Sequence, residues 1–124
     1  MIHEEICTYE VCKLAKEKGF PQDVFGTCEM KSACYLDDGR FCKDGCIYPI
    51  EDAYTAPTQS LLQRWLREEK GIDIAIVPLI SKVYSYIVYN ILDRNNRVVE
   101  TNAGYKSYEL ALEDALKYAL ENLV

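Results

Sequence analysis

The chain has 124 residues, of which 49% are hydrophobic and 27% are charged, and its formal net charge is -6. A chain of this length and composition can bury enough apolar surface to fold, so we expect a single domain over residues 1–124 and not a disordered chain. The acidic charge disfavours nucleic-acid binding, because that binding depends on clustered Lys and Arg side chains.

The opening residues, MIHEEICTYE, lack the positive start and the apolar run of a secretory signal. No stretch reaches the roughly 18 apolar residues that a membrane span requires. We therefore expect a cytoplasmic protein that does not bind membranes. Thiols are normally reduced in the cytoplasm, so an even number of cysteines is weak evidence for disulfides there.

The stretch TYEVCKLAKEKGF predicts a helix over residues 8–19. Thr8 is a suitable N-cap, and Gly19 can adopt the left-handed conformation that ends helices. Pro21 prevents the helix from continuing.

Residues 21–53 are predicted to form an irregular, cysteine-rich insert. Gly, Pro and Asp residues interrupt its short apolar pairs, which is typical of turns. The Asp38-Gly39 dipeptide suggests a hairpin turn between Tyr35-Leu36 and Phe41-Cys42.

A second helix is predicted over residues 55–70, with Pro57 in its first turn and an apolar stripe that includes Leu62 and Leu66. Residues 72–100 are predicted to form antiparallel strands, because IDIAIVP alternates in polarity and YSYIVYN is rich in aromatic and β-branched residues.

The last predicted helix covers residues 107–123, where Tyr108 and three leucines share a face with three alanines. The predicted fold class is therefore α+β: a small antiparallel sheet of two to four strands, covered by two or three amphipathic helices in a two-layer sandwich.

Two segments, APTQSLLQRWLREEKGIDIAI and GYKSYELALEDALKYAL, resemble uncharacterised small proteins carried by prophages and mobile elements of gut Bacteroides and their relatives. KLAKEKGF fits the same set, and the likeness covers residues 8–20 and 54–122. The resemblance implies a phage-related hypothetical protein and brings no activity with it. It does not extend to the cysteine-rich segment 28–46.

The cysteines leave three alternatives open. Structural zinc sites use ligands two to four residues apart, a spacing that only Cys42 and Cys46 meet, so the zinc candidates Cys28, Cys34, Cys42 and Cys46 are not favoured. Reduced, partly buried thiols are the preferred interpretation, with zinc and disulfides as alternatives. We predict no cofactor, and the isolated His3 indicates neither a ligand nor a catalytic base.

Tyrosines indicate a protein-binding surface. Tyr84 and Tyr86 share one face of a predicted strand and Tyr89 takes the other, so helices on one face of the sheet would leave one set outside. Amphipathic aromatic residues are favoured at protein interfaces. A homodimer through the sheet would use these side chains, and packing beneath the insert is the alternative.

The sequence therefore predicts a non-catalytic accessory protein that binds an unidentified protein partner, with no catalytic residues. One alternative is a DNA-binding, winged-helix-like regulator that uses the helix over residues 57–70, with phosphate contacts from Arg64, Arg67, Arg94 and Arg97. A second alternative is a zinc-stabilised interaction module.

Overall fold

The computed structural model describes residues 4–22, 24–25, 29–30, 32–45, 53–90, 98–100 and 104–124. The fold is α+β with small antiparallel sheets, as the sequence predicts. The chain separates into two compact units: an N-terminal unit, Ile6–Thr58, and a C-terminal unit of Met1–Glu5 with Gln59–Val124. Each unit is described by itself.

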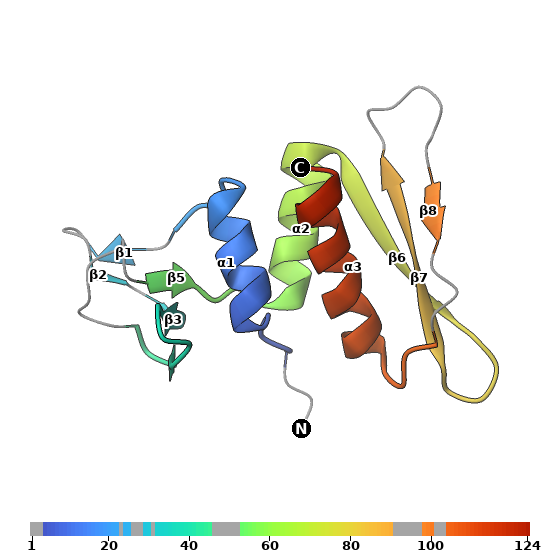
Figure 1. Ribbon diagram of the computed structural model, residues 1–124, viewed down its shortest axis with the longest axis horizontal. Helices are drawn as coiled ribbons and strands as arrows, with labels where there is room; N and C mark the ends of the chain where they lie inside the picture. Colours follow the sequence, from blue (N-terminus) through green and yellow to red (C-terminus); the bar gives the residue numbers. More distant parts are fainter. Residues whose placement is uncertain are drawn as a thin grey trace. The chain divides into compact units, whose positions relative to one another are not determined.

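The C-terminal unit is a two-layer sandwich (Figure 1). Its sheet has the strand order β6-β7-β8, and neighbouring strands are antiparallel. Helix α3 packs on β6 and β7, and helix α2 packs on β6 and on α3. These elements are α2 (Gln59–Lys70), β6 (Ile72–Pro78), β7 (Tyr84–Asn90), β8 (Val98–Glu100) and α3 (Tyr108–Asn122).

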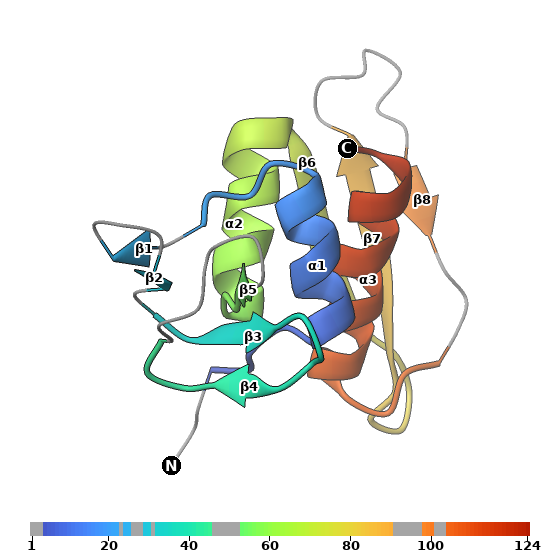
Figure 2. The same ribbon diagram turned by 60° about the vertical axis from the view of Figure 1, so that its left-hand side comes forward.

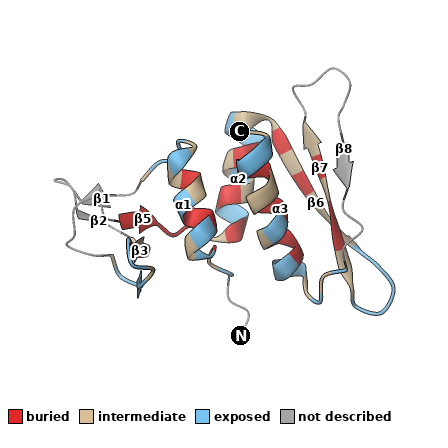
Figure 3. Ribbon diagram, viewed as in Figure 1, coloured by how far each residue is buried: buried red, intermediate tan, exposed pale blue. Residues whose placement is uncertain are grey.

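One face of β6 and β7 forms the core with the two helices. The inward side chains are the even-numbered residues of the strands, among them Ile72, Ile74 and Val88, each at most 4% exposed. Figure 3 shows this buried stripe along β6 and β7. Helix α3 contributes the predicted stripe, and its buried residues are Ala111, Leu112, Ala115, Leu116, Ala119 and Leu120.

Two details of the predicted helices are wrong. Helix α2 begins at Gln59 and not at residue 55, because Thr55 pairs with Cys34 in a sheet and Thr58 forms a bridge with Ile6. Tyr108 is 44% exposed, although it was assigned to the buried face of α3. It is the first residue of α3, and its ring makes an edge contact with that of Tyr84.

The strands predicted over residues 72–100 are confirmed where the structure describes them. The turn between β6 and β7 is closed by the Leu79 amide, which donates to the carbonyl oxygen of Val83 at 2.6 Å. Ser81 and Lys82 occupy the left-handed region, with φ of 65° and 60°. Residues 91–97, which include the predicted second turn, lie outside the described residues.

The N-terminal unit contains helix α1 (Tyr9–Glu17), which packs on β5 (Ala53–Thr55). The predicted caps of α1 are confirmed. The Thr8 hydroxyl accepts from the Val11 amide, and Gly19 has a φ of 97°. The amide of Phe20 donates to the carbonyl of Ala15 at 2.9 Å, as in a Schellman motif.

The described part of the predicted irregular insert is more regular than expected. It contains a hairpin of β1 (Val24–Phe25) with β2 (Glu29–Met30). It also contains β3 (Cys34–Leu36) and β4 (Phe41–Cys42), which form the predicted hairpin around Asp38-Gly39 (Figure 2). Strands β4, β3 and β5 form one antiparallel sheet. The missed strands are two or three residues long, too short to produce a recognisable alternation.

Aromatic side chains join α1 to this sheet. The ring of Tyr9 lies 5.8 Å from that of Tyr35 and 5.7 Å from that of Tyr54, both in edge contacts. The Tyr9 hydroxyl donates to the carbonyl of Asp37, and the Tyr54 hydroxyl donates to Oδ1 of the same residue at 2.9 Å. The Tyr35 hydroxyl donates to the carbonyl of Cys7. These hydrogen bonds fix the hairpin turn against the helix.

The C-terminal core predicts a large difference between two leucines of α3. Leu116 is 0% exposed and Leu110 is 56% exposed. We expect Leu116→Ala to lower the free energy of unfolding by about 2–5 kcal/mol, through lost transfer energy and a cavity. Leu110→Ala should change it by less than about 0.5 kcal/mol. Urea denaturation measures both, and equal losses would contradict the assigned core.

The environment of Tyr54 predicts a loss of stability at alkaline pH. Burial, reinforced by the hydrogen bond to Asp37, raises the pKa of Tyr54 to about 12 from 10.0. Above pH 10 the unfolded chain loses this proton while the folded chain keeps it, so stability falls as pH rises. Tyr54→Phe should cost about 0.5–1.5 kcal/mol at neutral pH through the lost hydrogen bond.

The advantage in stability of the wild type over Tyr54→Phe should then narrow between about pH 10 and 12. All other residues are common to the two proteins, so the difference between their stabilities isolates Tyr54. Denaturation curves at several pH values measure it, and a difference that stays constant over this range would show that the Tyr54 hydroxyl is not held in its neutral form.

Candidate functional site

The predicted tyrosines lie on different faces of β7. Tyr86 is 5% exposed and lies under α3, with its ring 6.5 Å from that of Tyr118. Burial, with a contribution from the Asp114 carboxylate, raises the pKa of Tyr86. Tyr86 belongs to the core, so its assignment to a partner-binding surface is wrong. The packing of α3 on β7 uses this face of the strand.

Tyr84 lies on the same face of β7 as Tyr86 and is the first residue of that strand. Its ring makes an edge contact with that of Tyr108, at 6.2 Å between centroids. Tyr84 and Tyr105 also exchange two backbone hydrogen bonds, which join β7 to the segment before α3. Tyr84 is partly exposed, and it positions the start of α3.

Tyr89 points to the opposite face, as the alternation predicts. This face, here called the outer sheet face, is formed by three cross-strand pairs, so its members come from both β6 and β7. They are Asp73 with Tyr89, Ala75 with Ile87, and Val77 with Ser85. All are partly exposed except Ser85, which is buried at 4%.

Neither α2 nor α3 lies on the outer sheet face, because both pack on the inward, even-numbered side chains (Figure 1). The middle pair, Ala75 with Ile87, is fully apolar. Among these six residues, Asp73 alone carries a charge, and it lies at one end of the paired region, while the register of β8 places Glu100 opposite Ile87. An apolar centre with a charged end is the arrangement found in protein interfaces.

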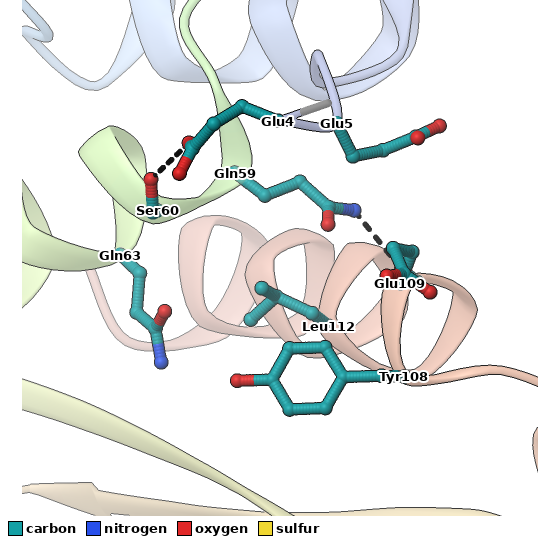
Figure 4. Close-up of a pocket in the computed structure, with 8 residues that line it drawn as sticks. All are labelled: Glu4, Glu5, Gln59, Ser60, Gln63, Tyr108, Glu109 and Leu112. Carbon is teal, nitrogen blue, oxygen red and sulfur yellow. Dashed lines mark hydrogen bonds between the residues drawn. The ribbon is translucent and has the colours of Figure 1, made fainter. Parts of the chain in front are cut away.

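A pocket of about 170 Å³ lies where the start of α2 meets α3 (Figure 4). It is lined by Glu4, Glu5, Gln59, Ser60, Gln63, Tyr108, Glu109 and Leu112. Three of these side chains are carboxylates, so the pocket favours cations over anions.

The polar groups of the pocket already bond to one another. Gln59 is 4% exposed, and its Nε2 donates at 2.9 Å both to the carbonyl of Glu109 and to Oε1 of Glu113. The Gln59 amide donates to the carbonyl of Glu5 at 2.8 Å. The Ser60 hydroxyl donates to Oε2 of Glu4 at 2.5 Å. These bonds tie residues 4 and 5 to α2, and α2 to α3. The arrangement therefore holds the unit together, and nothing in it indicates a reactive group.

The described cysteines are buried, with one exception. Cys7, Cys12 and Cys34 are each 0% exposed, and Cys42 is partly exposed. Of the zinc candidates, Cys34 and Cys42 lie directly opposite each other on β3 and β4. Cys28 and Cys46 lie outside the described residues, as does His3. Within the described segments, no three His, Cys, Asp or Glu side chains are grouped so that they could hold a metal.

The residues proposed for DNA contact are partly described. Arg64 lies on the exposed side of α2, and its Nε is 3.0 Å from Oε1 of Glu68. Arg67 is exposed and directly precedes Glu68 and Glu69 in the sequence. Arg94 and Arg97 lie outside the described residues. Neighbouring carboxylates oppose phosphate binding by this helix.

Comparison with protein-family models, with curated proteins and with solved structures gives no match. In the segments that the structure describes, no helix combines the length and apolarity needed to cross a bilayer.

Sequence reasoning missed Gln59, which is the central polar residue of the C-terminal unit. A buried glutamine at a helix start has no distinctive pattern, although the preceding Pro57 and Thr58 mark the boundary. It also assigned the tyrosines of β7 to two faces without deciding which face the helices cover. That choice depends on the direction in which α3 returns over the sheet.

The hydrogen bonds of Gln59 predict a specific loss of stability. Gln59→Leu keeps the apolar volume but leaves the Glu109 carbonyl and the Glu113 carboxylate without this donor, which should cost about 1–3 kcal/mol. The matched change Ser60→Ala removes an exposed hydrogen bond and should cost less than about 0.5 kcal/mol. Denaturant unfolding compares them, and a neutral Gln59→Leu would show that these bonds do not hold the helices together.

Proposed function

We propose that the chain is a non-catalytic protein-binding module, and that its outer sheet face binds a second copy of the chain. The observation that supports this most is the apolar centre of a face on which neither α2 nor α3 packs. An antiparallel sheet with one solvated face normally shows polar side chains there. Here Ala75, Val77 and Ile87 occupy those positions.

The match of apolar side chains, and not charge, favours a second copy as the occupant. The chain has a formal net charge of -6, so two copies repel each other over most of their surface. The outer sheet face has one fully apolar pair, Ala75 with Ile87, but it also carries Asp73 at one end and Glu100, which the register of β8 places opposite Ile87. In a two-fold arrangement the Ala75–Ile87 pairs face each other, with Asp73 at the end of the face and Glu100 along its β8 edge.

The dimensions of the sheet limit the area of this interface. Two strands of seven residues are about 23 Å long, and three strands are about 10–15 Å wide. The resulting area of a few hundred Å² is smaller than the roughly 800 Å² per partner of a standard interface. We therefore expect a weak dimer, with a dissociation constant between about 10 µM and 1 mM.

The biological setting is proposed from the sequence alone. The resemblance of residues 8–20 and 54–122 to proteins of prophages and mobile elements supports an accessory role in such an element, in the cytoplasm. Self-association is compatible with that role, because a weak dimer can dissociate when another partner binds.

Sedimentation analysis of the full chain tests the proposal. The wild type should show reversible dimerisation as its concentration rises from about 10 µM to 1 mM. Ile87→Lys places a charge at the centre of the face and should raise the dissociation constant at least tenfold, a change of about 1.4 kcal/mol. Ala75→Lys, on the neighbouring strand, should have the same effect. Two variants are used so that misfolding of one of them does not decide the result.

The matched control is Leu110→Lys, which adds the same charge at an exposed leucine of α3. It should leave the dissociation constant within about twofold of the wild type. A wild type that stays monomeric up to about 1 mM contradicts the proposal. So does a dimer that both sheet variants leave unchanged while they remain folded by circular dichroism.

A further inference from the structure

We propose that Cys34 and Cys42 form a reversible disulfide across the β3–β4 hairpin, which makes this pair a redox site of the N-terminal unit. The site takes thiol and disulfide compounds of low molecular weight as its reaction partners. It is independent of the outer sheet face, which belongs to the other unit.

The register of the hairpin places the two cysteines directly opposite each other. Cys34 and Cys42 are direct partners in the antiparallel pairing of β3 with β4 (Figure 2). Residues opposite each other in such a pair have Cα atoms about 4.5–5.5 Å apart, within the 4.4–6.8 Å that a disulfide spans. Cys42 also packs against the cluster of Cys34, Leu36 and Ala53, so both side chains lie on one face.

The position of the two cysteines in the hydrogen-bond ladder of β3 and β4 makes their disulfide easy to reduce. The Leu36 amide donates to the carbonyl of Arg40, so that pair is hydrogen-bonded, and the alternation makes Cys34 and Cys42 a hydrogen-bonded pair as well. Side chains at such pairs have Cβ atoms nearer 5.5 Å apart, whereas a disulfide needs about 3.8 Å. Closing that gap strains the hairpin, and strained disulfides are reduced more easily.

The exposure of the two thiols sets the order of the thiol–disulfide exchange steps. Cys42 is partly exposed and Cys34 is 0% exposed, so exchange begins at Cys42. Its thiolate attacks oxidised glutathione, forms a mixed disulfide and releases one glutathione thiolate. The Cys34 thiolate then attacks the Cys42 sulfur and releases the second glutathione. The protein loses two electrons and two protons, and the glutathione disulfide gains them as two thiols.

The other described cysteines do not compete for this reaction. Cys7 and Cys12 are 0% exposed, and the Cys12 thiol donates to the carbonyl of Cys7 at 3.7 Å. A small disulfide in solution therefore reaches Cys42 before either of them. This difference in access gives the experiment its internal control.

Non-reducing tryptic mapping of the full chain tests the proposal. The chain is equilibrated with oxidised glutathione, quenched with acid and alkylated before digestion. Trypsin cuts after Lys31, Arg40 and Lys43, so Cys34 and Cys42 fall in separate peptides, residues 32–40 and 41–43. Cys28 and Cys46 fall in two further peptides, and Cys7 and Cys12 share the peptide of residues 1–13, so a link between Cys34 and Cys42 has a mass of its own.

The expected result is a linked pair of peptides 32–40 and 41–43, which disappears when reduced glutathione is added in excess. Cys42→Ser should abolish the link, and Cys12→Ser should leave it. Links from Cys34 or Cys42 to Cys28 or Cys46 would overturn the proposal, as would the absence of any link. Retained zinc that protects both thiols from oxidation would also overturn it and would favour the metal alternative.

Discussion

The packing of α3 against the inward face of β6 and β7 is the constraint on which the C-terminal unit depends. Small alanines and buried leucines alternate along α3, which lets the helix approach the strands closely while the leucines fill the space between. Side chains in a strand alternate between two faces, so fixing the inward face also fixes the outer one. The same packing buries Tyr86 and turns Ile87 and Tyr89 away from the helices.

The two units are stabilised in different ways. The C-terminal unit relies on aliphatic burial, and Gln59 supplies the buried polar link between its helices. The N-terminal unit has short strands, and tyrosine hydroxyls bonded to Asp37 and Cys7 hold its hairpin and helix together. These different constructions separate the two proposed properties, because the apolar sheet face lies in one unit and the facing thiols lie in the other.

The sequence predicted those elements that carry a strong periodic or capping signal. Thr8 and Gly19 bounded α1 correctly, and the alternation of residues 72–78 predicted β6 with its inward side chains. Prediction failed where pairing with residues distant in the sequence decides the local structure. Residues 55–58 have a helical pattern, but their backbone groups bond to Gln22, Ala33 and Cys7, which lie far away in the sequence. Of the candidate surface, Tyr89 was correctly placed opposite Tyr86, but the covered face could not be chosen without the path of α3.

The most direct test of the account is a dilution series followed by methyl NMR on the full chain. The methyl signals of Val77 and Ile87 report on the outer sheet face, and those of the fully buried Leu116 report on the core. The account predicts that the Val77 and Ile87 shifts change with concentration while the Leu116 shifts do not. Val77 and Ile87 signals that stay constant up to about 1 mM, or changes confined to other residues, would contradict it.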